Sequence, residues 1–341
     1  MRTPDFEQFL RVLRRSGRPD HLPFYEHIAS PGFIARYTRT PFDHMSIDDP
    51  DYWRIYVDFW LSMGYDCVPM EIPPKLPLPK GHDRLSEGSE AFVVIRTRED
   101  FERYPWPDES SPIDFYHFET VARLLPEGAK IAGGVCAGPY EWVSRMMGTV
   151  GLAYALADDP ELVRMVFEKI SRLHVSAVRQ LASMDAVGAL RQGDDLGFKT
   201  STFLSPDDLR RYVFPIYRAM VSEAHKAGKP FILHSCGNLE AVYEDLIEYC
   251  RVDAKHSFED VIMPVCEFKK KYGNRVTPLG GLDVDVICRS SEDEIRAYTR
   301  SMIEKCFYDG WWALGTGNSL TDYMPVENYL AVLDEGMKVA G

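Results

Sequence analysis

The sequence lacks the features of a membrane-bound or secreted protein. No run of roughly 18 apolar residues occurs, so no helix is predicted to cross a bilayer. The first residues, MRTPDFEQFLRVLRR, contain acidic side chains and no apolar stretch typical of a secretory signal. The 7 cysteines are odd in number and widely scattered, which does not indicate a disulfide framework. We therefore expect a cytoplasmic protein with reduced thiols and no membrane contact.

Positive charge is also scarce. The chain has 39 Lys and Arg residues against 52 Asp and Glu residues, a formal charge of −13. This balance argues against nucleic acid as a partner, because phosphates need a basic surface. A polyanionic substrate would need a local cluster of Arg or Lys for the same reason. The remaining partner class is a small molecule.

A glycine-rich phosphate loop is missing after the first apolar run, where a doubly wound nucleotide-binding sheet usually carries GxGxxG. A doubly wound sheet is thus the weaker alternative. Eight apolar runs alternate with helical patterns, which predicts an α/β protein with a closed (β/α)8 TIM barrel. The expected strands lie within 22–28, 65–72, 130–136, 186–195, 229–238, 252–258, 275–283 and 310–318.

Three amphipathic patterns predict long helices, at 160–183, 205–228 and 290–306. Ser205 precedes Pro206 and two Asp residues, and Ser291 stands three residues before Glu294, both signals of a helix start. We expect one barrel domain over residues 1–341. Residues 73–115, rich in Pro, Gly and charge, are expected to form a lid-like insertion after the second strand, too short for a core of its own.

Polar side chains gather at the carboxyl ends of the expected strands, which meet at one mouth of a barrel. Burying such groups at apolar strand ends is costly without a purpose. They are Glu26, His27, Glu71, Cys136, Asp194, Asp195, His234, Cys236, His256, Glu259, Asp283, Thr316 and Asn318.

The sharpest local signal is the sequence HSCGN at 234–238. Residues i and i+2 of a strand point to the same side, so the imidazole of His234 and the thiol of Cys236 could bind one ion. Zinc favours such nitrogen and sulfur ligands. The alternative is a hydrogen-bonded His beside an inert, buried Cys.

Carboxylates at two other strand ends are candidates for catalysis. One residue of the pair Asp194 and Asp195 could cap the following turn, while the other faces the pocket as an acid, base or ligand. Glu71 follows an apolar strand, where desolvation would raise its pKa unless a cation lies near. The alternatives are capping or solvated aspartates and a salt-bridged glutamate at the rim.

The remaining candidates are assigned to substrate binding: Glu26, His27, Tyr140, Asp195, His256, Asp283 and Thr316. For Glu26 and His27, strand alternation favours the pocket for one of the two. His256 could equally be a hydrogen-bonded core histidine, and Tyr140 could equally be a packing residue.

Five segments, in order, resemble the uroporphyrinogen decarboxylase superfamily over residues from about 20 to the C-terminus. They are AGPYEWVSRMMG (137–148), GDDLGFKTSTFLSPDDLRRYVFPIYRAMV (193–221), HSCGN (234–238), PLGGLDVDVI (278–287) and ALGTGNSLTDYMPVENYLAVL (313–333). The resemblance implies a (β/α)8 barrel. It also implies one of two activities, cofactor-free decarboxylation of uroporphyrinogen or zinc-dependent methyl transfer involving methylcobalamin.

The chain departs from both branches. Glu26 and His27, in YEHIASPGFIARY, stand where the decarboxylases have the basic RQAGRY motif, and LGTG at 314–317 replaces LGHG. His234 and Cys236 match the first two zinc ligands of the methyltransferases, but Thr316 occupies the position of the third.

The resemblance to the methyltransferases implies Zn²⁺ held by His234, Cys236 and a carboxylate. Asp194 or Glu71 would supply this carboxylate or act as a general base. The chain has no DxHxxG motif for corrinoid binding, so the corrinoid would come on a partner protein. The resemblance also implies a homodimer. Metal-free decarboxylation of a tetrapyrrole or smaller acid, and a barrel that binds tetrapyrrole or corrinoid without catalysis, are the alternatives.

Overall fold

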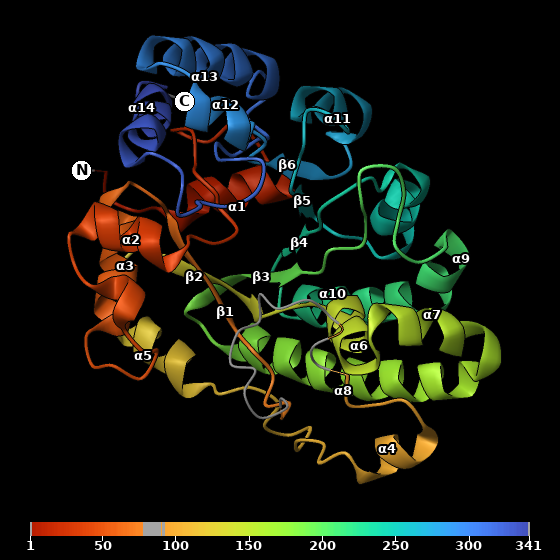
Figure 1. Ribbon diagram of the computed structural model, residues 1–341. Coiled ribbons are helices and arrows are strands. Elements are labelled where there is room, and N and C mark those ends of the chain that lie inside the picture. The colour runs from red at the N-terminus through yellow and green to blue at the C-terminus, as the bar shows by residue number, and fades with distance from the viewer. Residues whose placement is uncertain (1, 78–89, 91–92, 340–341) are drawn as a thin grey trace.

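Six parallel strands form the central sheet of the computed structural model, which describes residues 2–77, 90 and 93–339 (Figure 1). The strands pair in the order β1-β2-β3-β4-β5-β6, so each strand lies beside the next along the chain. Their bounds are β1 Cys67–Ile72, β2 Lys130–Val135, β3 Val187–Gly193, β4 Phe231–His234, β5 Ala254–His256 and β6 Thr277–Leu279.

Two further segments extend this sheet into a barrel. Ala313 bridges Leu279 of β6 in parallel, and Leu314 bridges Phe24 in parallel. The eight predicted segments are therefore present in the predicted order, and the fold is the expected (β/α)8 type. The first and last segments form bridges rather than regular strands. Pro23 has no amide proton to donate and glycines interrupt 310–318, both of which weaken a regular ladder.

Helices surround the strands (Figure 1). The three predicted long helices are confirmed, and the segment at 205–228 includes a π-helical turn at Leu209–Val213. Ser291 and Glu294 form the predicted capping box. The α-helices are α1 Phe6–Arg14, α2 Pro31–Thr38, α3 Tyr52–Ser62, α4 Arg98–Arg103, α5 Tyr116–Leu124, α6 Pro139–Met147, α7 Thr149–Asp158, α8 Pro160–Ser183, α9 Pro206–Asp208, α10 Phe214–Lys226, α11 Val265–Tyr272, α12 Val284–Arg289, α13 Glu292–Cys306 and α14 Val326–Met337.

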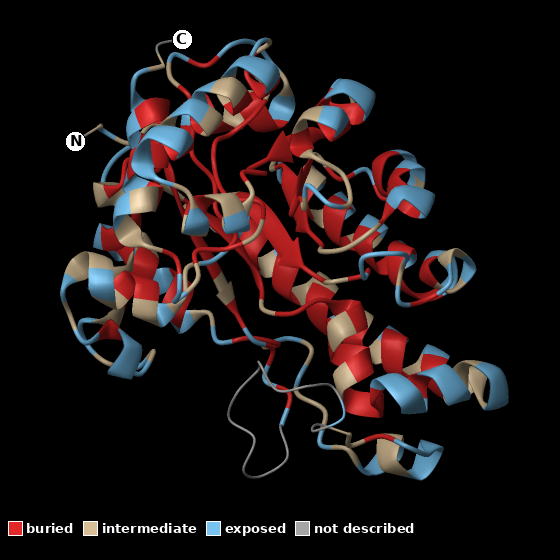
Figure 2. Cartoon of the chain, turned by 45° about the horizontal axis from the view of Figure 1, so that its top comes forward, coloured by how far each residue is buried: buried red, intermediate tan, exposed pale blue. Residues whose placement is uncertain are grey.

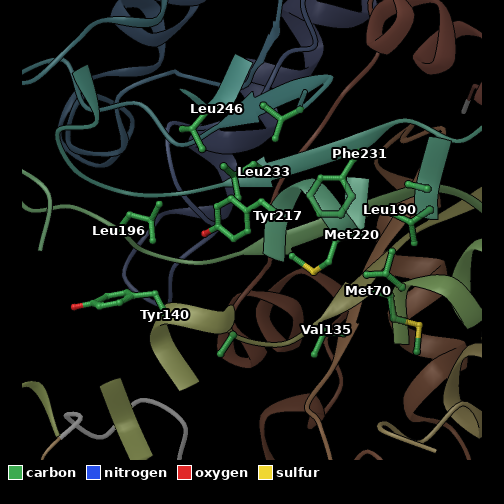
Figure 3. Packing of buried hydrophobic residues seen from close by; sticks show 14 of the residues in the cluster. Met70, Val135, Tyr140, Leu190, Leu196, Tyr217, Met220, Phe231, Leu233 and Leu246 are labelled. Atoms are coloured by element: carbon green, nitrogen blue, oxygen red, sulfur yellow. The ribbon is translucent and has the colours of Figure 1, made fainter. Parts of the chain in front are cut away.

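Side chains alternate in direction along each strand and so form two buried layers, one outside and one inside the barrel. Outward side chains such as Leu190 and Leu233 pack toward Tyr217 and Met220 of α10 (Figure 3). Inward side chains near the amino ends of the strands are mostly small and pack against α1, which closes that end of the barrel; they include Cys67, Ala132, Ala189, Ile232, Ala254 and Ala313. The strands are buried along most of their length (Figure 2). Only the carboxyl ends are therefore left to build a cavity.

The expected insertion at 73–115 is described in part. Residues 78–89 and 91–92 of it lie outside the described residues. Elsewhere in the insertion, Pro74 bridges Ile113 in an antiparallel direction, and α4 lies between them in sequence. Among the residues that the structure describes, no helix is both long and apolar enough to cross a membrane.

Candidate active site

A cavity of about 220 Å³ opens at the carboxyl ends of the strands. Its lining is mostly polar, as the sequence predicts for this end of the barrel. The lining residues are His27, Ile28, Glu71, Cys136, Ala137, Glu141, Arg145, Gly193, Asp194, Asp195, His234, Asn318 and Ser319.

Three potential ligand atoms of different kinds lie together beside this cavity, two of them on the lining residues His234 and Asp195 and the third on Cys236. His234 is the last residue of β4, and Cys236 follows it by two residues. Nε2 of His234 lies 3.5 Å from Sγ of Cys236 and 3.7 Å from Oδ1 of Asp195. Ligand atoms of all three residues lie within 4.8 Å of one another. An imidazole, a thiol and a carboxylate are thus placed where one cation could contact all three.

The turn after β4 aims these groups. The backbone N–H of Cys236 donates to Oδ1 of Asp195 at 2.9 Å. Gly237 then adopts a φ of +86°, and a Cβ atom there would lie 2.1 Å from the carbonyl carbon of Gly197. Glycine is required at this position because the conformation is left-handed and the two backbones meet.

The two neighbouring aspartates have different surroundings. Asp194 is fully buried and accepts hydrogen bonds from the amides of Tyr140 and Glu141, at 3.0 and 2.9 Å, and from the hydroxyl of Tyr217 at 2.7 Å. It therefore holds the first turn of α6. The side chain of Asp195 is 43% exposed, so Asp195 supplies the third donor near His234.

Burial changes the protonation of the acids around the cavity. It raises the pKa of Asp194 to about 7, against the opposing effect of its hydrogen bonds. Burial and the neighbouring charge of Asp194 raise the pKa of Glu141 to about 8. Burial raises the pKa of the Cys236 thiol to about 12 in the absence of a cation. These shifts favour the protonated forms of the Glu141 carboxyl and the Cys236 thiol.

Three imidazoles stack across the barrel interior. The ring of His27 lies parallel to that of His234, with centroids 3.8 Å apart. Nδ1 of His234 lies 2.7 Å from Nδ1 of His256, whose Nε2 is 3.2 Å from the carbonyl oxygen of Thr316. Burial holds the pKa of each imidazole below its usual range. His256 therefore lies behind His234 and outside the cavity lining.

Glu71 has a buried cationic partner. Nη2 of Arg191, on β3, donates to Oε2 of Glu71 at 2.9 Å, and Nη1 donates to the carbonyl oxygen of His27 at 2.5 Å. Arg191 is only 1% exposed. Its role was not predicted from the sequence, although Arg191 lies two residues before Gly193 and so on the same inward face of β3. It is also a charged residue within an apolar run. Glu141 and Arg145 in the cavity wall were missed too, because α6 looks amphipathic.

Glu26 and Thr316 bind each other. The amide and hydroxyl of Thr316 donate to Oε1 and Oε2 of Glu26 at 2.5 and 2.6 Å, and Tyr329 donates to Oε1 at 2.8 Å. Glu26 is fully buried, and burial raises its pKa to about 7. Neither residue lines the cavity.

Two predicted substrate-binding residues also lie apart from the cavity lining. Asp283 caps α12 and accepts from the amides of Asp285 and Val286. Tyr140 lines a separate hollow of about 430 Å³, where its ring stacks on Phe203.

The model of the uroporphyrinogen decarboxylase (URO-D) family matches residues 86–338. The chain belongs to the uroporphyrinogen decarboxylase family. Family membership supports an enzymatic role for the cavity. A comparison with curated protein sequences gives no significant match.

One solved structure agrees with this family fold, at a TM-score of 0.69. A methyltransferase from Methanosarcina mazei is similar at a TM-score of 0.69 and 14% identity, covering 96% of this chain and 97% of that chain. A Listeria monocytogenes protein described as a vitamin-B12-independent methionine synthase has a TM-score of 0.49 and 14% identity, covering 94% of this chain and 99% of that chain. At such identity the first likeness shows the fold alone.

As a member of the uroporphyrinogen decarboxylase family, the chain departs at two sequence positions that meet in space. Glu26 stands where the resemblance implies a basic motif, and Thr316 stands where it implies a third thiol ligand. The hydroxyl of Thr316 donates to Glu26. This side chain is therefore already engaged, and the third donor beside His234 comes from Asp195 instead.

Proposed function

We propose that the protein is a zinc-dependent methyltransferase that moves a methyl group between a small substrate and a corrinoid carried by a partner protein. The observation that carries this proposal is the convergence of His234 Nε2, Cys236 Sγ and an Asp195 carboxylate oxygen beside the cavity, which His234 and Asp195 line. Zn²⁺ prefers this mixture of ligands, and a catalytic site uses about three of them plus an open position.

The spacing of the donors fits a tetrahedral ion. Two ligand atoms about 2.1 and 2.3 Å from a tetrahedral zinc lie about 3.6 Å apart. The observed separations from His234 Nε2 are 3.5 Å to Cys236 Sγ and 3.7 Å to Asp195 Oδ1. The thiol must lose its proton on binding, and a cation would reverse the effect of burial on its pKa. Metal uptake should therefore release a proton.

Zinc bound by these residues would act as a Lewis acid on a hydroxyl, ether or thiol of the substrate. The chain's own groups would orient that substrate. Glu71, held by Arg191, presents a carboxylate to the cavity, and the His27 ring lines the cavity beside it, with Nε2 3.8 Å from Oε2 of Glu71. Glu71 is the proposed general base, since Asp194 has its oxygens occupied by α6 and Tyr217.

The size and charge of the cavity support a small substrate. Pockets for drug-sized ligands span roughly 300–1,000 Å³, and this cavity is about 220 Å³. Of the guanidinium groups at this cavity, Arg191 donates to Glu71, and Arg145 lies 3.6 Å from Glu141 with a buried Nη1 that has no hydrogen-bond partner. An eight-carboxylate tetrapyrrole would need several free guanidinium groups.

Metal-free decarboxylation is the second candidate, and one observation favours it. Glu141 lines the cavity, and its pKa is raised to about 8, so it would carry a proton at neutral pH. Such an acid could protonate a substrate carbon after loss of CO2.

Metal analysis tests the first candidate. We expect protein purified without chelators to contain about one zinc per chain and the His234→Ala variant to contain little. His44→Ala, an exposed histidine outside the cavity, is the matched control and should retain the metal. Equal and negligible zinc in wild type and His234→Ala would refute the metal assignment.

Activity separates the remaining alternatives. Methyl transfer to or from free cobalamin that is lost with a chelator supports the proposal. Chelator-insensitive turnover of uroporphyrinogen would support decarboxylation, and corrinoid binding without products would support a non-catalytic barrel. We also expect a homodimer, which analytical ultracentrifugation would detect.

A further inference from the structure

Strand β5 pairs in parallel with β4, with His256 in register with His234. We propose that Lys255, His256 and Ser257 form an outer shell that prepares His234 and Cys236 to bind a cation. All three are buried, and none lines the cavity. This inference rests on the proposed metal function, and it names residues that act on the ligands rather than on the substrate.

The hydrogen bonds of His256 determine which nitrogen of His234 carries a proton. The carbonyl oxygen of Thr316 can only accept, so Nε2 of His256, 3.2 Å away, must carry the hydrogen. A neutral His256 then has a lone pair on Nδ1. Nδ1 of His234 lies 2.7 Å from that lone pair and must donate to it.

The consequence is a fixed tautomer of His234. With its proton on Nδ1, a neutral His234 has its lone pair on Nε2, the atom 3.5 Å from Cys236 Sγ and 3.7 Å from Asp195 Oδ1. Metal-binding histidines generally use such a partner on the second nitrogen to orient the ring. Both imidazoles are buried, and burial disfavours the charged imidazolium form. The lone pair is thus aimed at the proposed ion before the ion arrives.

A second set of contacts, made by Ser257 and Lys255, involves the thiol of Cys236. The Ser257 hydroxyl donates to Sγ of Cys236 at 3.2 Å. Ser257 has a φ of +82°, which a non-glycine residue rarely adopts. Lys255 Nζ holds this conformation by donating to the carbonyl of Ser257 and, at 3.3 Å, to that of His256. Its ammonium also lies 4.3 Å from the ring centroid of Phe258.

This arrangement places a hydroxyl donor 3.2 Å from the sulfur. Outer-shell hydrogen bonds of this kind orient a metal ligand. The strained backbone at Ser257 is retained where it aims the hydroxyl, which is a common location for such strain.

Nuclear magnetic resonance of the ¹⁵N-histidine-labelled, metal-free protein tests the tautomer of His234 directly. We expect His234 to show a protonated Nδ1 and an unprotonated Nε2. In His256→Leu this preference should be lost. In His256→Asn it should be retained, because the side-chain oxygen of Asn can accept near the position of Nδ1. A proton on Nε2 of His234 in the wild-type protein would overturn the inference without any variant.

Zinc affinity, measured by competition with a chromophoric chelator, tests whether the fixed tautomer of His234 strengthens metal binding. We expect His256→Leu to weaken zinc binding about 10- to 100-fold, the usual effect of losing an outer-shell partner, and His256→Asn to restore most of it. His117→Leu removes another buried imidazole, bound to Trp53 outside the cavity, and should leave the affinity unchanged. Equal affinity for wild type and His256→Leu would refute the outer-shell role.

Failure of the proposed metal function is distinguishable from failure of this inference. Wild-type protein that shows the expected tautomer and binds no zinc would remove only the metal function.

Two substitutions at Ser257 separate the hydroxyl from the backbone strain. Ser257→Ala removes the hydroxyl and keeps the strain, whereas Ser257→Gly removes both. We expect both variants to slow alkylation of Cys236 in the metal-free protein, followed by mass spectrometry of its peptide, and to weaken zinc binding alike. Alkylation and affinity at wild-type levels in Ser257→Gly would overturn this role of Ser257.

Discussion

The carboxylate of Asp195 accepts a hydrogen bond from the backbone N–H of Cys236 at 2.9 Å. This bond joins the end of β3 to the turn after β4 and leaves Asp195 beside the imidazole of His234. The carboxylate of the preceding residue, Asp194, binds α6 instead. Asp194 therefore stabilises the helix, and Asp195 lies beside His234 at the cavity.

The first prediction contrasts these two aspartates. Asp195→Ala should weaken zinc binding at least tenfold and lower the free energy of unfolding by about 1 kcal/mol, since the side chain is partly exposed. Asp194→Ala should lower the free energy of unfolding by about 3 kcal/mol or more, because Tyr140, Glu141 and Tyr217 lose a buried acceptor. Denaturant unfolding and chelator competition measure both. The reverse ranking would contradict the assignment.

The second prediction concerns the buried pair of Arg191 and Glu71. Arg191→Met should destabilise the fold by about 3–5 kcal/mol, because it leaves a carboxylate and the carbonyl of His27 without a donor. Adding Glu71→Gln should recover part of this loss, since the unpaired charge is removed. A double-mutant cycle by urea unfolding gives the coupling. Strictly additive losses would show that the two side chains do not interact.

The third prediction is a pH dependence from Glu26. Its folded pKa of about 7 lies above its ordinary value of 4.5, so the folded protein binds this proton more tightly than the unfolded chain. The stability contribution is full below pH 4.5 and is lost as the pH rises to about 7, at roughly 1.4 kcal/mol per pH unit. Glu26→Gln should be correspondingly less sensitive over this window. Parallel stability curves for the two proteins would contradict this.

The fourth prediction concerns Gly237. Gly237→Ala combines a φ of +86° with a Cβ atom 2.1 Å from the carbonyl carbon of Gly197. We expect a loss of about 2 kcal/mol or more in the free energy of unfolding, together with weaker zinc binding. Gly228→Ala is the control, because φ there is +71° but no atom lies within 4 Å of the added carbon. It should cost only the conformational strain and leave metal affinity unchanged.

Local patterns were sufficient to predict most of the fold. The amphipathic pattern predicted the observed bounds of α8, Pro160–Ser183, because its period acts within a few residues, and the structure adds an N-cap at Asp159. The closing segments were predicted as strands but form bridges around Phe24 and Leu314. These two segments come from opposite ends of the chain. A local sequence pattern therefore does not show how many hydrogen bonds form between them.

The sequence alone determined the order of the barrel segments, because this order follows from periods of a few residues, and it brought His234 and Cys236 together, although β4 ends at His234 and Cys236 lies in the turn after it. It also placed carboxylates at the strand ends. Only the tertiary structure decided that Asp195 rather than Asp194 or Glu71 stands beside those donors, that Arg191 neutralises Glu71, and that His256 orients His234. These relations depend on the lateral register of neighbouring strands and on helix contacts, which bring together groups that are far apart in sequence.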